Sequence, residues 1–540
     1  MKKIISLIIV CTIIISGMFI YGKSDKKDLL EDNNGPIIAA VIDGKASTTF
    51  PTTNKYTATV ECTRNGIKQD VGAKATWNGT KWVVSFNDIS AGNVRCNATF
   101  ITKVPTLAET ILANNEVKTP LTTPGAEVSA YTLDDVTTTS TYSVSSTDQS
   151  YYVTYGTGWK ANGTKFNLTG TAVTTNTYAN SYSSLVGKYL PYISILSSGS
   201  KTAGTMMTTT NLGSVYYVVS ATSSSFTYKT ISSNKNTTEA LLASTDDDYG
   251  TSYYFRGAVK NNYVEFANKC WRIVRVGGDE SVKLILHNDN PTGAANPCDA
   301  ANNSASAAFA RYSGETYKSA FNTNYNDNAY VGFKYGTAGS STYEATHANT
   351  NNSTILTNLE TWYNNNLKAY ESVIDDNVWC NDKTNVTDTT FNPYGYSNVN
   401  GLGYGTNVTY YGATQRLIST SNSAGGTGPS LKCNGELSKI TSKIGLITAD
   451  ELAFAGYAVR GYITTSYLKE NATGYSWWSL SPAGFYNKSL SYVFRVRSDN
   501  DAIDICNVNV DSSVRPVISL VSSITISGVS GTSEDPYVVK

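Results

Sequence analysis

Charge is scarce in this sequence. Only 16% of the 540 residues are Asp, Glu, Lys or Arg, and 42 basic side chains balance 42 acidic ones. A protein that binds nucleic acid needs an excess of positive charge to neutralise phosphates, so we expect no nucleic-acid partner. The length exceeds what a single hydrophobic core normally serves, so several domains are expected.

Catalytic signatures are scarce as well. The two histidines, His287 and His347, have no second His or Cys at zinc-ligand spacing, and we expect both on the surface. No G-x-S-x-G elbow, P-loop or dinucleotide fingerprint occurs. The adjacent acids Asp450 and Glu451 are typical of a helix start, and Asp246–Asp248 lack the spacing of a calcium loop. The sequence therefore predicts a binding protein without catalytic residues, metal or cofactor.

The abundant residues favour strands. Thr, Ser, Asn, Gly and 38 Tyr stand where most proteins have Lys and Glu, and this mixture suits strands and turns better than helices. We expect an α+β chain that is mostly β.

The N-terminus predicts an extracellular location. Lys2 and Lys3 precede Ile4–Tyr21, an uncharged run near the lower length limit for crossing a bilayer. No A-x-A cleavage site follows. We expect residues 1–22 to be an uncleaved single-pass anchor in the cell membrane, with the bulk of the chain outside. The alternative is a cleaved signal peptide and a secreted protein.

The cysteine count predicts disulfides and one leftover thiol. Outside the cell cysteines normally pair, and Cys11 lies in the apolar run, which leaves an odd number of seven. One cysteine must then be unpaired. The expected pairs are Cys62 with Cys96, which face one core, and Cys380 with Cys433. The pairing of Cys270, Cys298 and Cys506 stays open, and a Cys270–Cys298 bridge would leave Cys506 over.

Residues 36–104 read as a small β domain. In YTATVEC and VRCNATF, apolar and polar residues alternate with the period of a strand, and Asn78-Gly79 predicts a hairpin turn between two others. We expect a small immunoglobulin-like sandwich, although its cysteine spacing is short. Residues 105–117 follow as a helical spacer, with Thr106 and Glu109 placed as a capping box.

Two further regions complete the chain. Residues 118–235 are rich in Ser, Thr and Tyr and fit either a low-complexity stalk or a second β-rich domain. We favour the domain, because a stalk does not need Trp159, Phe166, Tyr216 and Tyr217. Residues 245–540 contain strands, a helix at TILTNLETWYNNNL and another after Thr448, with many Asn- and Gly-rich connections.

The stretch Trp477–Leu520 alternates between two kinds of residue. Apolar residues with the Pro, Gly and Arg of strand corners look like a buried scaffold, on which we place Trp477, Trp478, Phe494 and Arg515. Between them lie patches of Tyr, Asn, Ser and Asp, the residues that adaptable binding surfaces use. Ordinary surface turns are the alternative. The candidate ligand contacts are Tyr486, Asn487, Ser489, Tyr492, Arg497, Asp499, Asn500, Asp501, Asp504 and Asn507.

These motifs carry a resemblance to a known family. WWSLSPAGF, VFRV, VNVDSSVRPVISL and IGLITADELAFAGYA resemble the variable proteins diversified by diversity-generating retroelements, over roughly residues 245–540. The resemblance implies a C-type lectin fold of the formylglycine-generating-enzyme kind and a hypervariable face that binds an extracellular protein or glycan. The enzyme that names this fold oxidises cysteine, but the chain has no matched reactive pair in this domain, so we expect no catalysis.

The family diversifies by mutating template adenines. Asparagine codons that end in a pyrimidine can then encode Tyr, Ser, Asn, Asp, Ile, Leu, Arg or Cys, but not Lys. The patch residues fit this alphabet, and so do Ile503, Ile505 and the odd Cys506, whereas Lys488 does not. An undiversified surface adhesin or wall-associated structural protein of the same fold would share the framework and remains the alternative.

Overall fold

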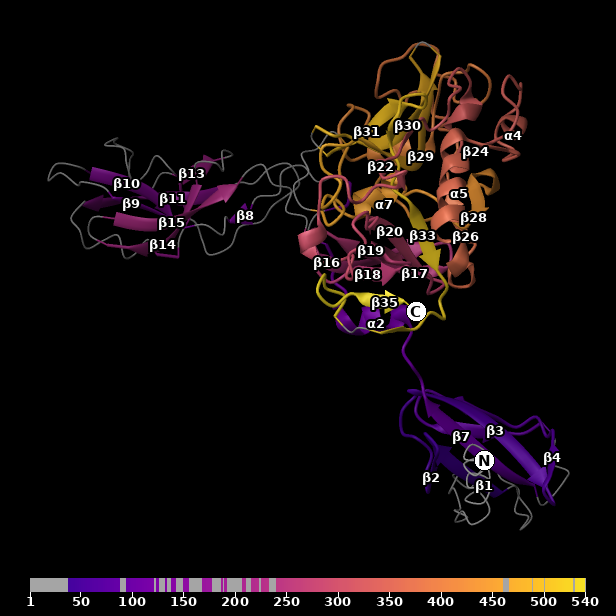
Figure 1. Cartoon of the computed structure of the whole chain (residues 1–540). Coiled ribbons are helices and arrows are strands. Elements are labelled where there is room, and N and C mark those ends of the chain that lie inside the picture. The colour runs from indigo at the N-terminus through magenta and orange to yellow at the C-terminus, as the bar shows by residue number, and fades with distance from the viewer. Residues whose placement is uncertain are drawn as a thin grey trace. The chain divides into compact units, whose positions relative to one another are not determined.

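The computed structural model describes residues 37–87, 94–120, 239–459, 466–487, 489–499, 501–527 and 530–539, together with strands and turns between 123 and 232 (Figure 1). The chain is mostly β, with several sheets, as the composition predicts. It divides into two compact units, Met1–Pro105 and Thr106–Lys540. No helix of the described residues is long and apolar enough to cross a bilayer, and the anchor expected at residues 1–22 lies outside them.

The first unit contains a five-stranded sheet. Its strands follow the order β2-β1-β7-β3-β4, with a separate β5–β6 hairpin. The expected alternation is confirmed in β3 and β7, where every second side chain turns inward. The bounds are β1 Ile37–Ile42, β2 Lys45–Ser47, β3 Tyr56–Arg64, β4 Ile67–Gln69, β5 Lys74–Trp77, β6 Trp82–Ser85 and β7 Arg95–Thr102.

The Cys62–Cys96 disulfide is present and joins neighbouring strands. The two residues lie directly opposite each other in the antiparallel pair β3–β7. An immunoglobulin bridge, by contrast, connects two sheets. The pairing of this disulfide is therefore confirmed, but its place within one sheet departs from the immunoglobulin arrangement.

The helix α2, Leu107–Asn114, begins with the predicted capping box. The Thr106 side chain accepts from the Glu109 N–H, and the Glu109 carboxylate accepts from the Thr106 N–H at 2.9 Å. Leu107 and Ile111 are fully buried in the core of the second unit. The interpretation of this helix as a spacer is therefore wrong, because its apolar face completes the core of the domain that follows.

The strands described between Thr132 and Ser232 form an insertion within the second unit. Before the insertion, Val117 pairs with Leu242, and the Lys118 N–H donates to the Leu242 carbonyl at 2.8 Å. Beyond this pair the chain still contacts the core, because Gly125 is buried beside Leu417 and Ala453. Trp159 and Phe166 lie outside the described residues. The described strands form two sheets and are β8 Thr132–Leu133, β9 Thr138–Thr141, β10 Gln149–Thr154, β11 Leu168–Asn176, β12 Tyr189–Pro191, β13 Met206–Thr209, β14 Val215–Ala221 and β15 Ser225–Ser232.

Residues 106–118 and 239–539 together are called the C-terminal domain below. Its eight-stranded sheet has the path β16-β17-β19-β18-β35-β34, and β20 joins β19 to β33. β18 and β19 form a tight hairpin, since Ala267 and Asn268 both have positive φ. The bounds are β16 Leu241–Asp247, β17 Gly250–Arg256, β18 Tyr263–Phe266, β19 Lys269–Val276, β20 Val282–Asn288, β33 Val517–Leu520, β34 Ile526–Ser527 and β35 Tyr537–Val539.

A second sheet of six strands carries the region of interest. Its path is β23-β32-β29-β30-β31, with β27 paired to β29. In Figure 1, β29 to β31 lie together at one end of the C-terminal domain and β35 with α2 at the other. The bounds are β23 Lys318–Ser319, β27 Thr409–Tyr410, β29 Trp477–Tyr486, β30 Leu490–Val496, β31 Ile503–Asn507 and β32 Ser512–Ser513.

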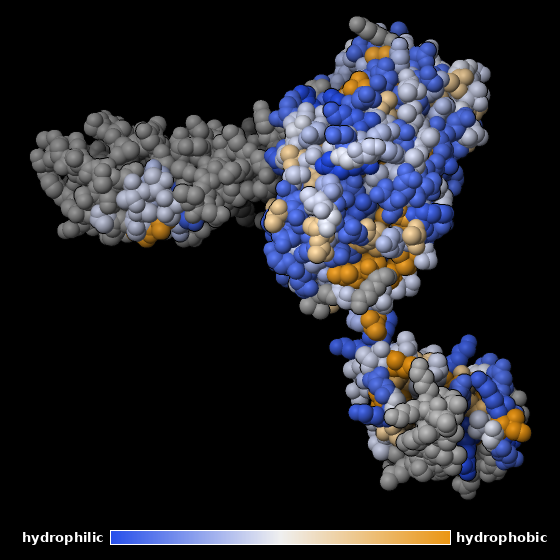
Figure 2. Space-filling model, viewed as in Figure 1, coloured by the Kyte–Doolittle hydropathy of each residue, from blue (hydrophilic) through white to orange (hydrophobic). Residues whose placement is uncertain are grey.

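Short helices and hairpins cover these sheets. Both helices predicted in this domain, α5 and α7, are confirmed, and α7 has the expected Thr448–Glu451 capping box. The face seen in Figure 2 is mostly hydrophilic. The bounds are η3 Ala300–Asn302, β21 Arg311–Tyr312, β22 Glu315–Thr316, η4 Asn328–Val331, β24 Lys334–Tyr335, α4 Tyr343–Thr346, β25 Asn351–Asn352, α5 Thr354–Asn366, η5 Lys368–Val373, β26 Asn377–Cys380, α6 Gly412–Leu417, η6 Glu436–Ser438, β28 Lys439–Ser442 and α7 Ala449–Phe454.

The topology predicts that the insertion is dispensable for folding of the C-terminal domain. We expect replacement of residues 127–237 by a six-residue Gly/Ser linker, which keeps the buried Gly125, to leave the thermal midpoint of the domain within about 3 °C of the parent. Differential scanning calorimetry measures this. A matched deletion that also removes residues 106–120 should abolish or severely weaken the transition, because Leu107 and Ile111 leave the core. If both deletions lowered the thermal midpoint equally, the prediction that the insertion is dispensable for folding would be wrong.

Candidate functional site

Strand β29 is the framework of the region. All ten of its residues, Trp477–Tyr486, are buried. It pairs with β30 on one edge and with β27 on the other, and Pro482 lies where the β29–β30 register shifts, a position that tolerates a missing N–H. The helices α6 and α7 pack against the strand. A strand buried on both faces fixes the backbone of everything hydrogen-bonded to it.

The four residues assigned to the scaffold are buried, which suits that role. Trp477, Trp478 and Phe494 belong to the main core. Arg515 is fully buried with its guanidinium 5.0 Å from the ring centre of Trp477. Its Nε donates to the Leu286 carbonyl at 2.9 Å, and Nη1 donates to the Leu468 carbonyl at 2.6 Å. Burial lowers the pKa of Arg515 to about 10, so the side chain remains a cation at neutral pH. It connects β20, the segment at Leu468 and β29 through these contacts.

Tyr486 differs from the expectation of a surface patch, because only 2% of it is exposed. Its ring stacks on Tyr492 at 4.5 Å between ring centres and 7° between planes, and on Tyr396 at 5.0 Å and 21°. Gly484 makes this possible, since a Cβ there would lie 2.5 Å from Cε1 of Tyr486. Its placement on the exposed face was wrong, because the neighbouring glycine lets the ring fold down onto the sheet.

The rings Tyr396, Tyr486 and Tyr492 are called the tyrosine stack below. Tyr394 and Tyr410 also contact Tyr486, with ring centres 5.3 Å and 5.2 Å away. Tyr396 and Tyr394 come from a loop outside the stretch that the sequence singled out, so sequence reasoning missed them. The sequence indicates this loop only weakly, through Asn392, because asparagine favours turns.

The first group of candidate contacts surrounds the stack. Tyr492 is half-buried and lies opposite the half-buried Asn507 in the β30–β31 pair. Asn487 and Ser489 are exposed, have positive φ, and form the turn between β29 and β30. The Asn487 Nδ2 donates to the Tyr492 hydroxyl at 3.3 Å. Asn487, Ser489 and Asn507 thus lie at the same end of β30 as Tyr492.

The second group lies near the other end of β30 and β31. Arg497 donates through Nε to Asp499 at 2.8 Å, and its Nη1 lies 3.6 Å from the Asp504 carboxylate. Asp501 pairs with Lys469 at 2.7 Å. Asp504 is opposite Arg495, on the face of the strand pair opposite to that of Tyr492 and Asn507. The predicted contacts therefore form two groups instead of one continuous patch.

Four further residues of this region are either outside the described residues or buried. Asn500 and Lys488 lie outside the described residues. Cys506 is unpaired, as predicted from the cysteine count, but only 8% of it is exposed. Burial raises the pKa of its thiol. Ile503 is fully buried as well. Neither residue belongs to an exposed variable patch, because both side chains pack against the core.

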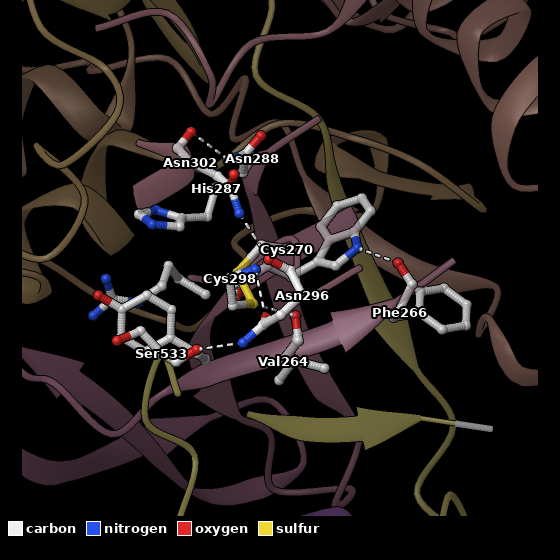
Figure 3. The surroundings of a disulfide bond; sticks show 12 residues. Val264, Phe266, Cys270, His287, Asn288, Asn296, Cys298, Asn302 and Ser533 are labelled. Carbon is white, nitrogen blue, oxygen red and sulfur yellow. Dashed lines mark hydrogen bonds between the residues drawn. A yellow bond between two sulfur atoms is a disulfide. The ribbon is translucent and has the colours of Figure 1, made fainter. Parts of the chain in front are cut away.

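The predicted Cys380–Cys433 disulfide is present. Cys270 pairs with Cys298, one of the pairings that the sequence left open. Figure 3 shows the Cys270–Cys298 bridge between β19 and the loop after β20, with the Cys298 N–H donating to Asn296 Oδ1 at 2.9 Å and Asn296 donating to the Ser533 carbonyl at 3.0 Å. The Cys270–Cys298 bridge ties the irregular segment after β20 to β19, and the Cys380–Cys433 bridge closes a loop whose regular elements are β27 and α6.

Both histidines are buried, so their predicted surface location is wrong. His287 packs against the ring of Tyr263 at 5.3 Å and lies 3.2 Å from the Asn471 Nδ2. His347 lies 2.8 Å from the Gly403 carbonyl through Nε2, and burial together with Lys383 lowers its pKa to about 3. Burial likewise holds the pKa of His287 well below its usual range. Both histidines are therefore packed inside the domain as neutral imidazoles. Their polar neighbours in the sequence did not indicate this burial.

A buried ion-pair network, which sequence reasoning also missed, lines a pocket beside the Cys380–Cys433 bridge. Glu451 Oε1 accepts from Lys283 at 2.7 Å and from Arg275 at 3.1 Å. Arg275 also donates to Asp247 at 2.7 Å. Burial alone would raise the pKa of Glu451, but Lys283 and Arg275 outweigh it and lower the pKa to about 2. Only long-range folding brings these charges together, so local sequence gave no signal.

Arg416 holds the second half of this network. Its Nε and Nη2 donate to the two oxygens of Asp450 at 2.6 Å and 2.9 Å, and its Nη1 donates to Asp382 at 2.7 Å. The pocket encloses about 40 Å³, room for a few water-sized groups at most. The carboxylates of Asp382, Asp450 and Glu451 are held in ion pairs, so the arrangement joins α6, α7 and the segment after β26. No group of three or more potential ligands within the described residues is arranged to hold a metal.

The lowered pKa of Glu451 predicts a pH-dependent stability. Glu451→Gln keeps a side chain that suits the capping box but removes the charge that Lys283 and Arg275 need. We expect a loss of about 3–5 kcal/mol in the free energy of unfolding at pH 7. Because the carboxylate contributes stability above its unfolded pKa, the difference should shrink as the pH falls from 4.5 towards 2. Denaturant titrations between pH 2 and 7 measure this.

The exposed pair Glu436–Lys439 provides the control. Glu436→Gln should leave the unfolding free energy nearly unchanged at neutral pH, because water screens an exposed pair. If Glu451→Gln had an equally small effect at pH 7, or an effect that stayed constant down to pH 2, the predicted stabilising role of the ion-pair network would be wrong.

No protein-family model matches the chain, and neither a curated protein nor a solved structure matches it. The likeness to variable proteins of retroelements therefore rests on the sequence motifs alone.

Proposed function

We propose that the protein is an extracellular receptor or adhesin whose C-terminal domain binds a ligand through the residues displayed on β29–β31. The observation that carries this is the separation of two environments within one sheet. β29 is wholly buried. The turn and strand ends attached to it present Asn487, Ser489, Tyr492 and Asn507 at exposed or half-exposed positions. A rigid support with displayed side chains is the arrangement that precise binding requires.

The displayed residues suit recognition. Tyrosine offers a large contact surface with few rotatable bonds, and Asn, Ser and Asp adapt their hydrogen bonds to different partners. Arg497, Asp499 and Asp504 add a charged cluster at the second end of the strands. We assign them a supporting contact role for ligands large enough to reach both groups. No catalytic role is proposed for any of these residues.

Three disulfides indicate an oxidising environment. Together with the apolar segment at residues 1–22, they support a cell-surface location, with a single-pass anchor and an extracellular bulk. Secretion after cleavage of this segment is the alternative.

The burial pattern refines the proposal of diversification by a retroelement. A position that changes freely must tolerate many side chains, and exposed positions do so at little cost. Asn487, Ser489 and Tyr492 meet this condition at least in part. Tyr486, Ile503 and Cys506 do not, because a smaller or polar substitute would leave a cavity or an unpaired polar group in the core.

A second candidate is an undiversified adhesin or wall-associated protein of the same fold. The buried Tyr486 favours it, since that residue sits within the stretch where diversification would act. The two candidates share the binding face and differ in how the face varies between relatives.

Sequencing the same locus in sibling strains tests the proposal. We expect substitutions to concentrate at residues 487, 489, 492, 497, 499, 504 and 507, and to spare Tyr486, Ile503 and Trp478. The flanking DNA should carry a template repeat and a reverse-transcriptase gene. Conservation of the displayed residues, with neither element beside the gene, would select the undiversified adhesin. Variation spread evenly over β29 and its loops would contradict a binding face on these strands.

A further inference from the structure

Lys383, in the segment that follows β26, is a buried lysine without an acidic partner. Its Nζ contacts three neutral oxygens, the backbone carbonyls of Lys334 at 3.1 Å and of His347 at 3.3 Å and Oδ1 of Asn349. A buried ammonium group normally needs an opposite charge nearby. Without one, burial lowers the pKa of Lys383 to about 7, so much of its amine is unprotonated at neutral pH.

Two further lysines are buried in the described part of this domain, and both are paired with a carboxylate. Lys269 Nζ lies 2.6 Å from Asp289, and Lys283 Nζ lies 2.7 Å from Glu451. Lys383 is the exception. An unprotonated lysine amine is a nucleophile, and burial is one of the ways in which proteins produce it.

The side-chain carboxamide of Asn349 lies against this amine. A neutral amine keeps two N–H groups, which the carbonyls of Lys334 and His347 accept, and it has one lone pair. The third neighbour, Asn349 Oδ1, is within hydrogen-bond distance of Nζ, and Cγ lies one carbonyl bond, about 1.2 Å, from that oxygen. The lone pair therefore remains free to attack this electrophilic carbon.

The helix η6 holds both reacting residues. The Lys383 N–H donates to Ser438 Oγ at 3.0 Å, and Asn349 Nδ2 donates to the Leu437 carbonyl at 2.9 Å. The backbone of Asn349 has a φ of 59°, a left-handed conformation that asparagine adopts more readily than most residues. Groups fixed in contact in this way react in a unimolecular step and need no encounter, which speeds an otherwise slow reaction.

We propose that Lys383 and Asn349 join in an intramolecular amide cross-link, an inference that goes beyond the proposed binding function. Nζ attacks Cγ, the Nζ–Cγ bond forms, and the Cγ–Nδ2 bond breaks. One proton passes from Nζ to Nδ2, which leaves as ammonia. One amide replaces another, so no oxidant, reductant or further reactant is consumed. Asn349 is only half-buried, so the ammonia is released close to solvent.

The cross-link would close residues 349–383 into a covalent ring that includes α5 and Cys380. Cys380 is also bonded to Cys433. A reducing agent opens a disulfide but leaves an amide intact. The ring would thus remain closed under conditions that reduce every disulfide of the chain.

Peptide mapping of the folded, full-length chain tests the proposal. After denaturation, reduction and alkylation, trypsin cuts at Lys368, between the two residues, so only a cross-link keeps their peptides together. We expect a joined species that is one ammonia lighter than the sum of the two peptides, with no cleavage after Lys383. Lys383→Met and Asn349→Gly should each abolish this species, and the glycine suits the positive φ of the position.

The matched control is Lys432→Met, which changes an exposed lysine and should leave the joined species unchanged. Two separate, unmodified peptides from the parent protein would overturn the proposal, whatever the folding of the variants. A cyclic imide at Asn349 would overturn it as well, because it loses the same ammonia but joins no second peptide. Persistence of the joined species in Lys383→Met would show that another amine is linked and would also overturn it. None of these results bears on the binding face, which the sibling sequences test separately.

Discussion

The complete burial of β29 is the constraint on which the C-terminal domain depends. Ten consecutive buried residues cannot shift by one position without exposing apolar side chains and burying others wrongly. The strand therefore fixes the registers of β27 and β30, and β30 in turn fixes β31. Gly484 is part of the same constraint, because its missing side chain admits the ring of Tyr486. What the domain displays follows from what this strand buries.

The surroundings of β29 are fixed by charge and covalent bonds as well as by packing. Glu451 at the start of α7 reaches back to β19 and β20 through Arg275 and Lys283. Arg416 ties α6 to α7 and to the segment after β26, next to the Cys380–Cys433 bridge. Breaking one partner of such a buried pair leaves a charge without compensation. The irregular, Asn-rich connections are thereby held without a regular secondary structure of their own.

Local patterns could be predicted from the sequence, whereas long-range packing could not. The capping boxes at Thr106 and Thr448 depend on residues three positions apart, and the disulfides followed from location and cysteine count. The burial of Tyr486 depends on Gly484 and on rings far away in the chain. The same holds for α2, whose apolar face looked like that of a spacer helix until Ile524 and Tyr537 were seen beside it. Of the candidate site, the turn and strand-end residues were found, while Tyr394 and Tyr396 were missed because their loop has no strand pattern.

Hydrogen exchange of the full-length chain tests most directly whether a rigid buried strand supports a displayed surface. The amides of β29 should exchange only through unfolding of the whole C-terminal domain, with the slowest rates in the chain. The amides of Asn487, Ser489 and Asp499 should exchange orders of magnitude faster through local fluctuations. Exchange of β29 as fast as that of these turn residues would contradict the account.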